Sequence, residues 1–277
     1  MDRPILIGAV AYDQRVVPIW EGMRDYFREA GVPIDYVLYS NYDRQVESLL
    51  AGQIDIAWNT NLAWIKVCRR TDNRCRALAM RDVDADFKTL FVARTDSGIQ
   101  SLADIRGKRL ALGSADSGQA AILPIEFLRE AGVDAERECQ VSRFNLDVGK
   151  HGDTGTSELE VLRALSSGQA DAGAMADTTW IRQVAEGRVD PTQMRAIWTS
   201  PGYCHCNFTV LETFSEELGR RWTDALLGMT YDQPRWRELM DQEGLKRWLE
   251  ATPEVMKGYV SLWEAVERQG LTRSWPS

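Results

Sequence analysis

Residues 34–59 read IDYVLYSNYDRQVESLLAGQIDIAWN and combine a strand, a helix and a second strand. The first part, IDYVLYS, is rich in β-branched and aromatic residues, and IDIAWN has the same character. Between them, DRQVESLLAG has apolar residues at helical spacing and ends at Gly52, a residue typical of helix ends. A strand–helix–strand unit of this kind predicts a parallel sheet that is covered by helices.

The same alternation extends in both directions along the chain. Apolar residues at helical spacing run from Val16 to Ala30 and stop at Gly31, which predicts a helix. Further strands are expected at ALAMRD, TLFVAR, RLALG, residues 139–144, ADAGAM, MRAIWTS and CNFTVL, and further helices at LAWIKVC, SLADIRG, IEFLREA, residues 157–165 and TTWIRQVAEG. From Ser215 onward the pattern is almost entirely helical. The expected fold class is α/β, with mainly parallel sheets flanked by helices.

Two segments connect what we expect to be separate lobes. TLFVARTDSG leads from the first block of alternating elements into a second block, and AIWTSPGY leads back. We therefore expect residues 1–93 and 199–277 to form lobe I and residues 94–198 to form lobe II. A chain of 277 residues is long enough for two such lobes, and ligands usually bind in the cleft between them.

Composition narrows the range of partners. The net charge of −8 and the absence of a long Lys/Arg block argue against nucleic acid as a ligand. No segment approaches the roughly 20 consecutive apolar residues of a membrane span, and the first residues, MDRPILIGAV, lack the hydrophobic region of a signal peptide. We therefore expect the chain either to act in the cytoplasm or to have lost an export signal.

The five cysteines are an odd number, so at least one is expected to stay outside any intramolecular disulfide. Cys68 and Cys75 are close enough in sequence to pair. The number and spacing of the cysteines nevertheless do not resemble a disulfide framework. We expect the fold to rest on its apolar core.

Residues 113–124, GSADSGQAAILP, place small polar residues where a strand is expected to lead into a helix. Two interpretations are open. Either Ser117 or Asp116 caps the helix by accepting backbone hydrogen bonds, or the N–H groups at the helix N-terminus bind an anion, with the Ser117 hydroxyl as an added donor. Pro124 predicts a kink or a late start of the helix.

Three segments, SNYDRQVESLLAGQIDIAWNTNLAWI, SLADIRGKRLALGSADSGQAAILP and SSGQADAGAM, occur in order along most of the chain. Together they resemble the phosphonate-, phosphate- and phosphite-type substrate-binding proteins of ABC transporters, a branch of the type 2 periplasmic-binding-protein fold. The resemblance implies a two-lobed protein that closes on a small oxyanion in an interlobe cleft. It also implies a periplasmic or other extracytoplasmic location and a membrane permease as partner.

The resemblance further implies which residues bind the anion. In lobe II, the hydroxyl-rich turn of the family corresponds to Ser117, Gly118 and Gln119, and the N–H groups up to Ala120 are expected to contribute. Gly118 stands where relatives often have a hydroxyl residue, so one side-chain donor is absent. In lobe I, Tyr42 matches an aromatic hydroxyl beside the anion. A half-exposed tyrosine in a turn is the alternative interpretation.

Three polar residues, Asn59, Thr60 and Asn61, follow the next strand of lobe I. Asn59 takes a position that can be tyrosine in relatives, and amide and hydroxyl groups can donate to an oxyanion. His151, in the loop VGKHGDTGTS, matches a family histidine that reaches the anion, and a solvated loop histidine is the alternative. These departures from the family pattern leave the identity of the anion open.

The segment PGYCHCNFTVL raises the question of a metal site at His205. In an extended strand Cys204 and Cys206 point to one side and His205 to the other, so we expect no metal, and His205 is expected to face the cleft. Asp177 and Thr178 follow the strand ADAGAM, one residue out of step with a family acid that binds a ligand amine. An aminophosphonate is therefore less favoured.

A transport function competes with an enzymatic one. The sequence has no G-x-S-x-G, GKS/T or H-E-x-x-H motif, so we assign no catalytic residue and expect no cofactor. Ser117 would form a catalytic dyad with His151 or His205 only within hydrogen-bond distance. Some proteins of this fold are cytoplasmic enzymes of cofactor biosynthesis. A cytoplasmic enzyme or ligand sensor is thus the alternative to the expected monomeric transport protein.

Overall fold

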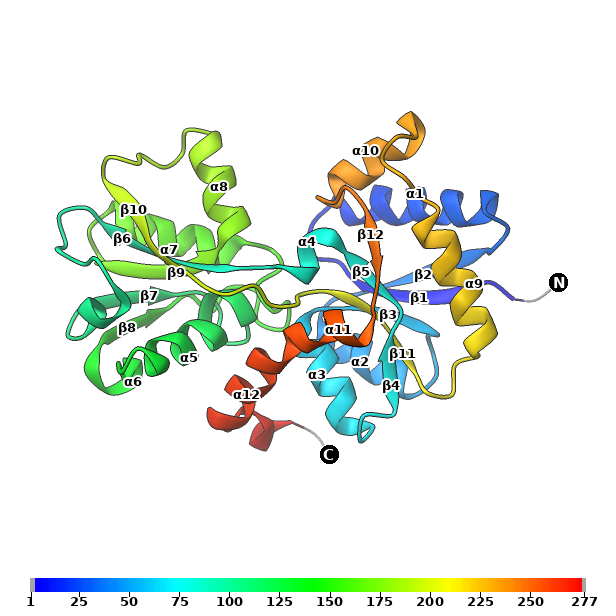
Figure 1. The fold of residues 1–277 in the computed structure, drawn as a ribbon, viewed down its shortest axis with the longest axis horizontal. Helices are drawn as coiled ribbons and strands as arrows, with labels where there is room; N and C mark the ends of the chain where they lie inside the picture. The colour runs from blue at the N-terminus through cyan, green and yellow to red at the C-terminus, as the bar shows by residue number, and fades with distance from the viewer. Residues whose placement is uncertain (1–2, 276–277) are drawn as a thin grey trace. The chain divides into compact units, whose positions relative to one another are not determined.

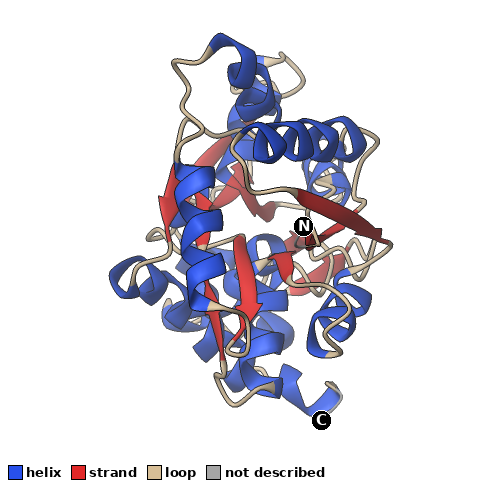
Figure 2. Cartoon of the chain, turned by 90° about the vertical axis from the view of Figure 1, so that its right-hand side faces the viewer, coloured by secondary structure: helices blue, strands red, loops and turns tan. Residues whose placement is uncertain are grey.

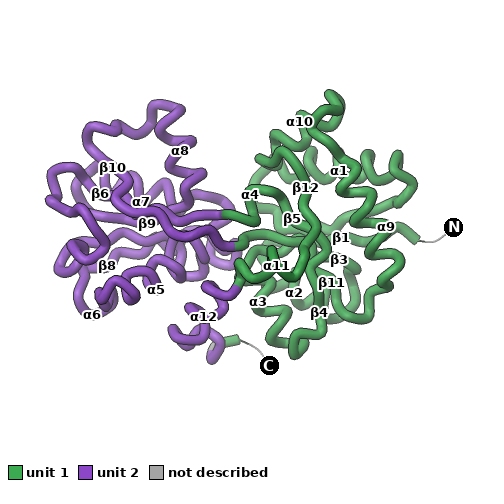
Figure 3. The backbone as a smooth tube through the Cα atoms, in the orientation of Figure 1, with its two compact units in different colours: residues 1–86, 204–259, 275–277 green, residues 87–203, 260–274 purple. Residues whose placement is uncertain are grey.

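The computed structural model describes residues 3–275 and divides them into two compact units (Figure 3). Unit 1 contains residues up to 86, residues 204–259 and residue 275, and unit 2 contains residues 87–203 and 260–274. These bounds differ from the predicted lobes, because the crossings lie after Asp86 and Tyr203 and because residues 260–274 belong to unit 2. Residues 1–2 and 276–277, which the prediction placed in lobe I, lie outside the described residues.

Residues 260–274 pack within unit 2 and form specific hydrogen bonds there. This segment forms α12 (Val260–Arg268) and the 3-10 turn η4 (Leu271–Ser274). Arg268 Nη1 donates to Glu126 Oε1 at 2.5 Å, and Gln269 Nε2 donates to the carbonyl of Ile122 at 2.8 Å. Contacts between residues so far apart in sequence leave no local pattern, which explains why the predicted lobe I included this segment.

The sheet of unit 1 has the strand order β2-β1-β3-β11-β4 (Figure 1). β2 and β3 run parallel to β1, whereas β11 runs antiparallel to both β3 and β4. All strands except β11 therefore share one direction, and β11 is the strand that follows the crossing back from unit 2. The strands are β1 (Ile5–Val10), β2 (Ile34–Tyr39), β3 (Ile56–Asn59), β4 (Cys75–Ala77) and β11 (Asn207–Leu211).

The sheet of unit 2 repeats this arrangement in the order β10-β6-β9-β7-β8. β7 runs parallel to β8 and β9, whereas β6 runs antiparallel to β9 and β10. The reversed strand, β6, again follows a crossing between the units. The predicted α/β class is confirmed, with one reversed strand in each sheet. The strands are β6 (Thr89–Arg94), β7 (Arg109–Leu112), β8 (Gln140–Arg143), β9 (Ala172–Ala176) and β10 (Met194–Thr199).

Helices flank both sheets, and Figure 2 distinguishes them from the strands by colour. In unit 1 they are α1 (Val16–Glu29), α2 (Tyr42–Leu50), α3 (Asn61–Arg70), α4 (Asp82–Ala85), α9 (Glu216–Leu227), α10 (Pro234–Gln242), α11 (Pro253–Met256) and the 3-10 turn η3 (Lys257–Tyr259). In unit 2, besides α12 and η4, they are η1 (Leu102–Ile105), η2 (Gly118–Ile122), α5 (Leu123–Glu130), α6 (Ala135–Glu138), α7 (Thr156–Ser166) and α8 (Asp177–Ala185). A capping box of Ser101 and Asp104 is present at η1.

The region after Ser215 is largely helical, as predicted, but it also contains a short strand. α10 ends at Gln242, and Gly244 has a left-handed φ of +71° that turns the chain away from the helix. The chain then forms β12 (Trp248–Glu250), which pairs antiparallel with β5 (Ala79–Arg81). Pairing with a strand far away in sequence thus overrides the local helical pattern of ELMDQEGLKRWL.

Candidate functional site

The predicted site residues stand at one edge of the sheet in each unit. In unit 1 this edge holds the ends of β2 and β3 and the start of β11, and Tyr42, Asn59–Asn61 and His205 lie there. In unit 2 it holds the ends of β7, β8 and β9, which are followed by residues 117–120, by His151 and by residues 177–178. In open α/β sheets, ligands bind outside the carboxyl ends of the parallel strands. Each edge is therefore a candidate ligand-binding edge of its own unit.

Ser117 caps the first helical turn after β7. It is the N-cap of η2, a turn of π-helix that leads into α5, and its Oγ accepts a hydrogen bond from the Ala120 N–H at 3.1 Å. The N–H groups of Gly118 and Gln119 belong to the first turn and have no acceptor within the helix. The α-helix itself starts late, at Leu123, in line with the prediction from Pro124.

A glycine brings the loop after β8 against this turn. A Cβ at Gly152 would lie 2.4 Å from Ser117 Oγ and 2.8 Å from Gln119 Nε2, so only glycine allows this approach. The N–H of Gly149 also donates to Asp116 Oδ2, at 2.5 Å. His151, next to Gly152, is 1% exposed. It is therefore an interior residue of the loop that covers Ser117, and the alternative of a solvated histidine is wrong.

Two further polar residues of this edge were not predicted. Ser157 and Glu158 lie in the first turn of α7, and both are buried. Within residues 3–275 the Ser157 hydroxyl oxygen has no hydrogen-bond partner. Glu158 Oε1 accepts from Gln119 Nε2 at 3.1 Å, and its Oε2 accepts from the N–H of Ala176 at 3.2 Å. A serine and an acid at a helix start are an ordinary capping pattern, so the sequence alone does not mark them as site residues.

Asp177 and Thr178 form the first turn of α8, directly after β9. The Asp177 Oδ1 accepts a hydrogen bond from the Thr178 N–H at 2.7 Å. Asp177 is half-buried and Thr178 is exposed. An acid held in this way can accept from a ligand donor through its second oxygen.

In unit 1 a chain of buried hydrogen bonds runs through Asn59. Its Oδ1 accepts from Gln45 Nε2 at 2.8 Å, and its Nδ2 donates to Thr209 Oγ1 at 3.0 Å. Thr209 donates to Asn207 Oδ1, and Asn207 Nδ2 donates to the Tyr259 hydroxyl at 2.8 Å. Both ends of the Asn59 amide are bonded within the protein. The structure thus gives Asn59 a structural role that the sequence did not predict.

The neighbours of Asn59 cap and anchor α3. Thr60 Oγ1 accepts from the Ala63 N–H at 3.2 Å, and Asn61 Nδ2 donates to the Cys204 carbonyl at 3.4 Å. Tyr42, the first residue of α2, is wholly buried in an apolar cluster, so the alternative of a half-exposed tyrosine is wrong. The three side chains are therefore fixed by their surroundings.

His205 and Cys206 meet a buried carboxylate. His205 Nδ1 lies 3.0 Å from Cys206 Sγ and 3.5 Å from Asp84 Oδ1. The expectation that these neighbouring side chains point apart is wrong, because β11 begins only at Asn207 and the preceding residues are not in a strand. His205 is 4% exposed and turns inward to Asp84.

Asp84 is paired with Arg81 in the same cluster. Arg81 donates to both carboxylate oxygens, with Nε–Oδ2 at 2.6 Å and Nη2–Oδ1 at 3.0 Å. Burial acts to raise the pKa of Asp84, but the charge of Arg81 and hydrogen bonds from His205 and Arg81 outweigh it and lower this pKa to about 2. Potential metal-ligand atoms of Asp84, His205 and Cys206 lie within 4.8 Å of one another, yet the carboxylate already neutralises a guanidinium.

The family of the chain follows from comparison with known proteins. Residues 7–256 match the family described as "ABC transporter, phosphonate, periplasmic substrate-binding protein". The chain belongs to this family. The predicted resemblance is thereby confirmed, and the protein is a substrate-binding protein of the phosphonate/phosphite ABC transporter type. No helix formed by residues 3–275 is long and apolar enough to cross a membrane.

Relatives within the phosphonate-binding family are distant. The chain is 22% identical over 244 residues to the "Probable ABC transporter phosphite binding protein PhnD1" of Prochlorococcus marinus (strain MIT 9301), a match that covers 84% of this chain and 79% of the relative. It is 24% identical over 184 residues to the "Phosphate-import protein PhnD" of Mycolicibacterium smegmatis (strain ATCC 700084 / mc(2)155), covering 62% of this chain and 54% of that protein.

Solved structures share the fold. The structure of PhnD1 from Prochlorococcus marinus in complex with methylphosphonate has a TM-score of 0.74 at 20% identity and covers 96% of this chain and 98% of its own. XAC2383 from Xanthomonas citri bound to ATP has a TM-score of 0.75 at 20% identity, with the same coverage of 96% and 98%. At these identities the likeness concerns the fold and not the ligand.

Proposed function

We propose that this protein captures a small phosphorus oxyanion, of the phosphonate, phosphite or phosphate type, and delivers it to an ABC transporter permease. The observation that best supports the proposal is the start of η2. There the N–H groups of Gly118 and Gln119 have no acceptor within the helix, and the end of a helix that carries N–H groups attracts anions. The names of the two relatives, a phosphite-binding and a phosphate-import protein, support the same class of ligand.

Hydroxyl groups extend this set of donors. Ser117 Oγ accepts from Ala120, which leaves the hydroxyl hydrogen for a ligand oxygen, since a hydroxyl can accept and donate at once. Ser157 is wholly buried, and within the described residues its hydroxyl oxygen has no partner. The cost of burying a polar group without a partner favours a bound molecule that supplies one. His151, if protonated, adds a charge-assisted bond.

The buried acid Glu158 refines the choice of ligand. Glu158 contacts the first turn of η2 through Gln119, whose Nε2 donates to Glu158 Oε1 at 3.1 Å. A carboxylate near the anion opposes a second negative charge but accepts a hydrogen bond from a P–OH group. We therefore propose that the protein prefers a singly charged, protonated oxyanion to a fully ionised one.

Unit 1 is proposed to contribute the corresponding edge of its own sheet. The first turn of α3, from Asn61, presents N–H groups, and Thr60 and Asn61 add polar side chains. Tyr42 and Asn59 are proposed to support this edge from beneath rather than to supply the main donors, because both are wholly buried. Asp177, Thr178 and His205 are proposed to border the ligand. The protein is proposed to act as a monomer outside the cytoplasm.

Isothermal titration calorimetry tests the class of ligand. Phosphate, phosphite, methylphosphonate and 2-aminoethylphosphonate are each titrated at pH 7, together with methanesulfonate. Methanesulfonate resembles methylphosphonate in shape but carries no proton at this pH, so we expect it to bind at least about tenfold more weakly, or about 1.4 kcal/mol. If none of the phosphorus oxyanions binds more tightly than about 1 mM, the proposal is wrong.

The variant Ser117→Ala tests the site in the same titrations. Loss of a hydroxyl that donates to a charged ligand should cost about 1.5–3 kcal/mol of binding free energy. Ser101→Ala is the matched control, because Ser101 caps η1 in the same unit through a capping box. We expect the control to lose stability but keep its affinity. If Ser117→Ala and the wild type bind with equal affinity, Ser117 acts only as a helix cap and does not contact the ligand.

A further inference from the structure

Two cysteine side chains of unit 1 are in contact. The sulfur atoms of Cys68 and Cys75 lie 3.4 Å apart, and all five cysteines of the chain are free thiols. Cys68 is near the end of α3, and Cys75 is the first residue of β4. A disulfide has a sulfur–sulfur distance of about 2.05 Å, so a small rotation of the side chains would suffice to close the bond.

The turn between the two cysteines holds them together. Asp72 and Asn73 have left-handed φ values of 51° and 61°, which reverse the chain after α3. The N–H of Asn73 donates to the Cys68 carbonyl at 2.7 Å, and Thr71 Oγ1 donates to the Val67 carbonyl at 2.8 Å. The backbone therefore returns Cys75 to Cys68 through bonds that do not depend on the sulfur atoms.

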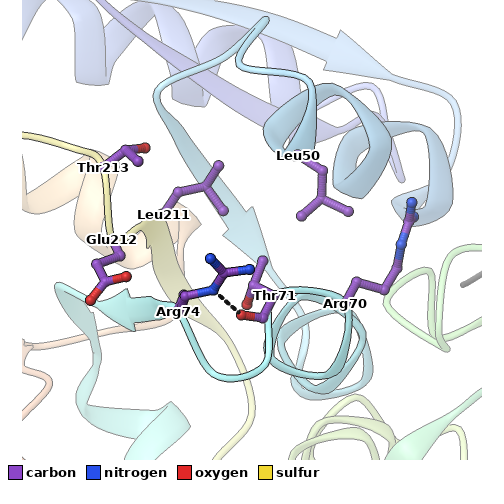
Figure 4. A pocket seen from close by; sticks show the side chains of 7 residues that line it. All are labelled: Leu50, Arg70, Thr71, Arg74, Leu211, Glu212 and Thr213. Atoms are coloured by element: carbon purple, nitrogen blue, oxygen red, sulfur yellow. Dashed lines mark hydrogen bonds between the residues drawn. The ribbon is translucent and has the colours of Figure 1, made fainter.

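The turn is also accessible to a reagent. Asp72, Asn73 and Arg74 are exposed, and Cys75 is half-buried, whereas Cys68 is buried. Figure 4 shows Thr71 and Arg74 beside an open pocket of about 330 Å³ at this end of unit 1, with Arg74 Nε donating to the Thr71 carbonyl. A small molecule or a flexible peptide can therefore approach the turn from solvent.

The two thiols differ in how readily they ionise. The hydrogen bond from Cys68 lowers the pKa of the Cys75 thiol, burial opposes this shift, and Thr71 lowers the pKa further. The hydrogen bond with Cys75 and burial raise the pKa of Cys68. Because the thiolate is the nucleophile in disulfide exchange, Cys75 is the thiol that reacts first.

We propose that Cys68 and Cys75 form an intramolecular disulfide when the protein meets a disulfide oxidant, such as oxidised glutathione or the disulfide of a dithiol oxidase. The Cys75 thiolate attacks the oxidant, forms a mixed disulfide and releases one thiolate. Cys68 then loses its proton and attacks the Cys75 sulfur, which releases the second thiolate. The two protein thiols are oxidised and the oxidant is reduced to two thiols, because the two protons lost by Cys75 and Cys68 are taken up by the two released thiolates.

The disulfide would connect two elements near the proposed ligand edge. α3 begins at Asn61, with Thr60 as its N-cap, and β4 is one of the two edge strands of the sheet. A covalent bond between the far end of α3 and β4 would anchor the helix that presents these polar residues. The inference does not depend on the identity of the ligand.

Mass spectrometry of the full chain tests this proposal. The reduced protein is exposed to oxidised glutathione at pH 8, denatured, and treated with N-ethylmaleimide. Of the five cysteines, we expect all to react before oxidation and three after it, with a mass loss of about 2 Da before alkylation. Trypsin cuts after Arg69, Arg70 and Arg74, so Cys68 and Cys75 should remain in one species only through the disulfide.

Two variants make the result specific. Cys68→Ser should keep glutathione on Cys75, because no second thiol can displace it, whereas Cys139→Ser should form the disulfide like the wild type. Cys139 is a half-buried thiol of unit 2 and serves as the matched control. Five reactive thiols after oxidation of the wild type, or a wild-type mixed disulfide that persists on Cys75, would overturn the proposal.

Discussion

A chain of buried hydrogen bonds holds several polar side chains of unit 1. Asn59 lies on β3, and Thr209 and Asn207 lie on the adjacent strand β11. Their side chains form a chain of hydrogen bonds that runs from Asn59 through Thr209 and Asn207 to the Tyr259 hydroxyl. Buried polar groups are stable only when they are satisfied, and such networks fix the register of the strands that bear them. The side chains of Asn59 and Asn207 at this edge are therefore held by bonds within the protein.

Asp84 makes the stability of the protein depend on pH. Its pKa of about 2 lies below the ordinary value, so it contributes stability that is fully present above about pH 4 and is lost as the pH falls towards 2. The shift corresponds to about 2 kcal/mol of unfolding free energy. We expect Asp84→Asn, which leaves Arg81 buried without its carboxylate, to cost about 3–5 kcal/mol at pH 7.

Urea unfolding at pH 7, 4 and 2.5 measures this effect. The free energy of unfolding of Asp84→Asn should fall less between pH 4 and 2.5 than that of the wild type. Asp96→Asn is the control, because Asp96 pairs with Arg94 at the surface, and we expect little change. Parallel pH profiles for the wild type and Asp84→Asn would show that the buried pair does not have the assigned role.

At the scale of elements, the start of η2 and the loop after β8 form one unit of structure. Ser117 caps the turn, and the backbone at Gly152 lies directly against Ser117 and Gln119. The cap and the anion site are therefore not exclusive interpretations of residues 113–124. Ser117 satisfies the N–H group of Ala120, and the N–H groups of Gly118 and Gln119 have no acceptor within the helix.

The variant Gly152→Ala tests this contact. A Cβ at this position would lie 2.4 Å from Ser117 Oγ, and the φ of +85° is left-handed, so we expect the loop to move away from η2. The affinity for the tightest phosphorus oxyanion should fall at least about tenfold, or about 1.4 kcal/mol, in calorimetry.

The variant Gly107→Ala distinguishes the effect of the lost contact with η2 from the effect of backbone strain at a left-handed glycine. Gly107 has a similar φ of +76° in the same unit, but nothing lies within 4 Å of its would-be Cβ. We expect this variant to lose about 1–2 kcal/mol of stability and to keep its affinity. The same affinity in both variants would contradict a role of the loop in binding.

At the scale of the whole molecule, local patterns predicted the α/β class, and the family resemblance indicated most of the candidate residues. Helix α1 follows directly from the helical spacing of its buried apolar residues, and strand β6 follows from a short run of apolar residues that are buried on both faces. β12 and the return of α12 to unit 2 depend on partners far away in sequence, such as β5 and Glu126. No local pattern encodes these contacts.

Only part of the candidate site could be predicted from the sequence. The turn at Ser117 has a recognisable composition, and the family resemblance drew attention to His151. The buried positions of Tyr42 and Asn59 and the part played by Glu158 depend on side-chain packing. The contact between His205 and Asp84 forms because β11 begins only at Asn207. The sequence pattern CHCNFTVL does not show this start.

A change in the dimensions of the molecule would accompany binding if donors of both units hold one ligand. A ligand shifts a conformational equilibrium only through contacts that differ between the states. We expect the radius of gyration from small-angle X-ray scattering to decrease when a binding oxyanion is added at saturation. An unchanged radius with a bound oxyanion would indicate that one unit binds alone.

The most direct test concerns the N–H group of Gly118. The protein is labelled with ¹⁵N-glycine, and the Gly118 signal is assigned by its loss in Gly118→Ala. During titration with the phosphorus oxyanion that binds most tightly in calorimetry, we expect this amide signal to shift and to saturate at the calorimetric Kd, while the signals of Gly107 and Gly132 stay in place. A Gly118 signal that does not move while calorimetry reports binding would contradict an oxyanion site at the start of η2.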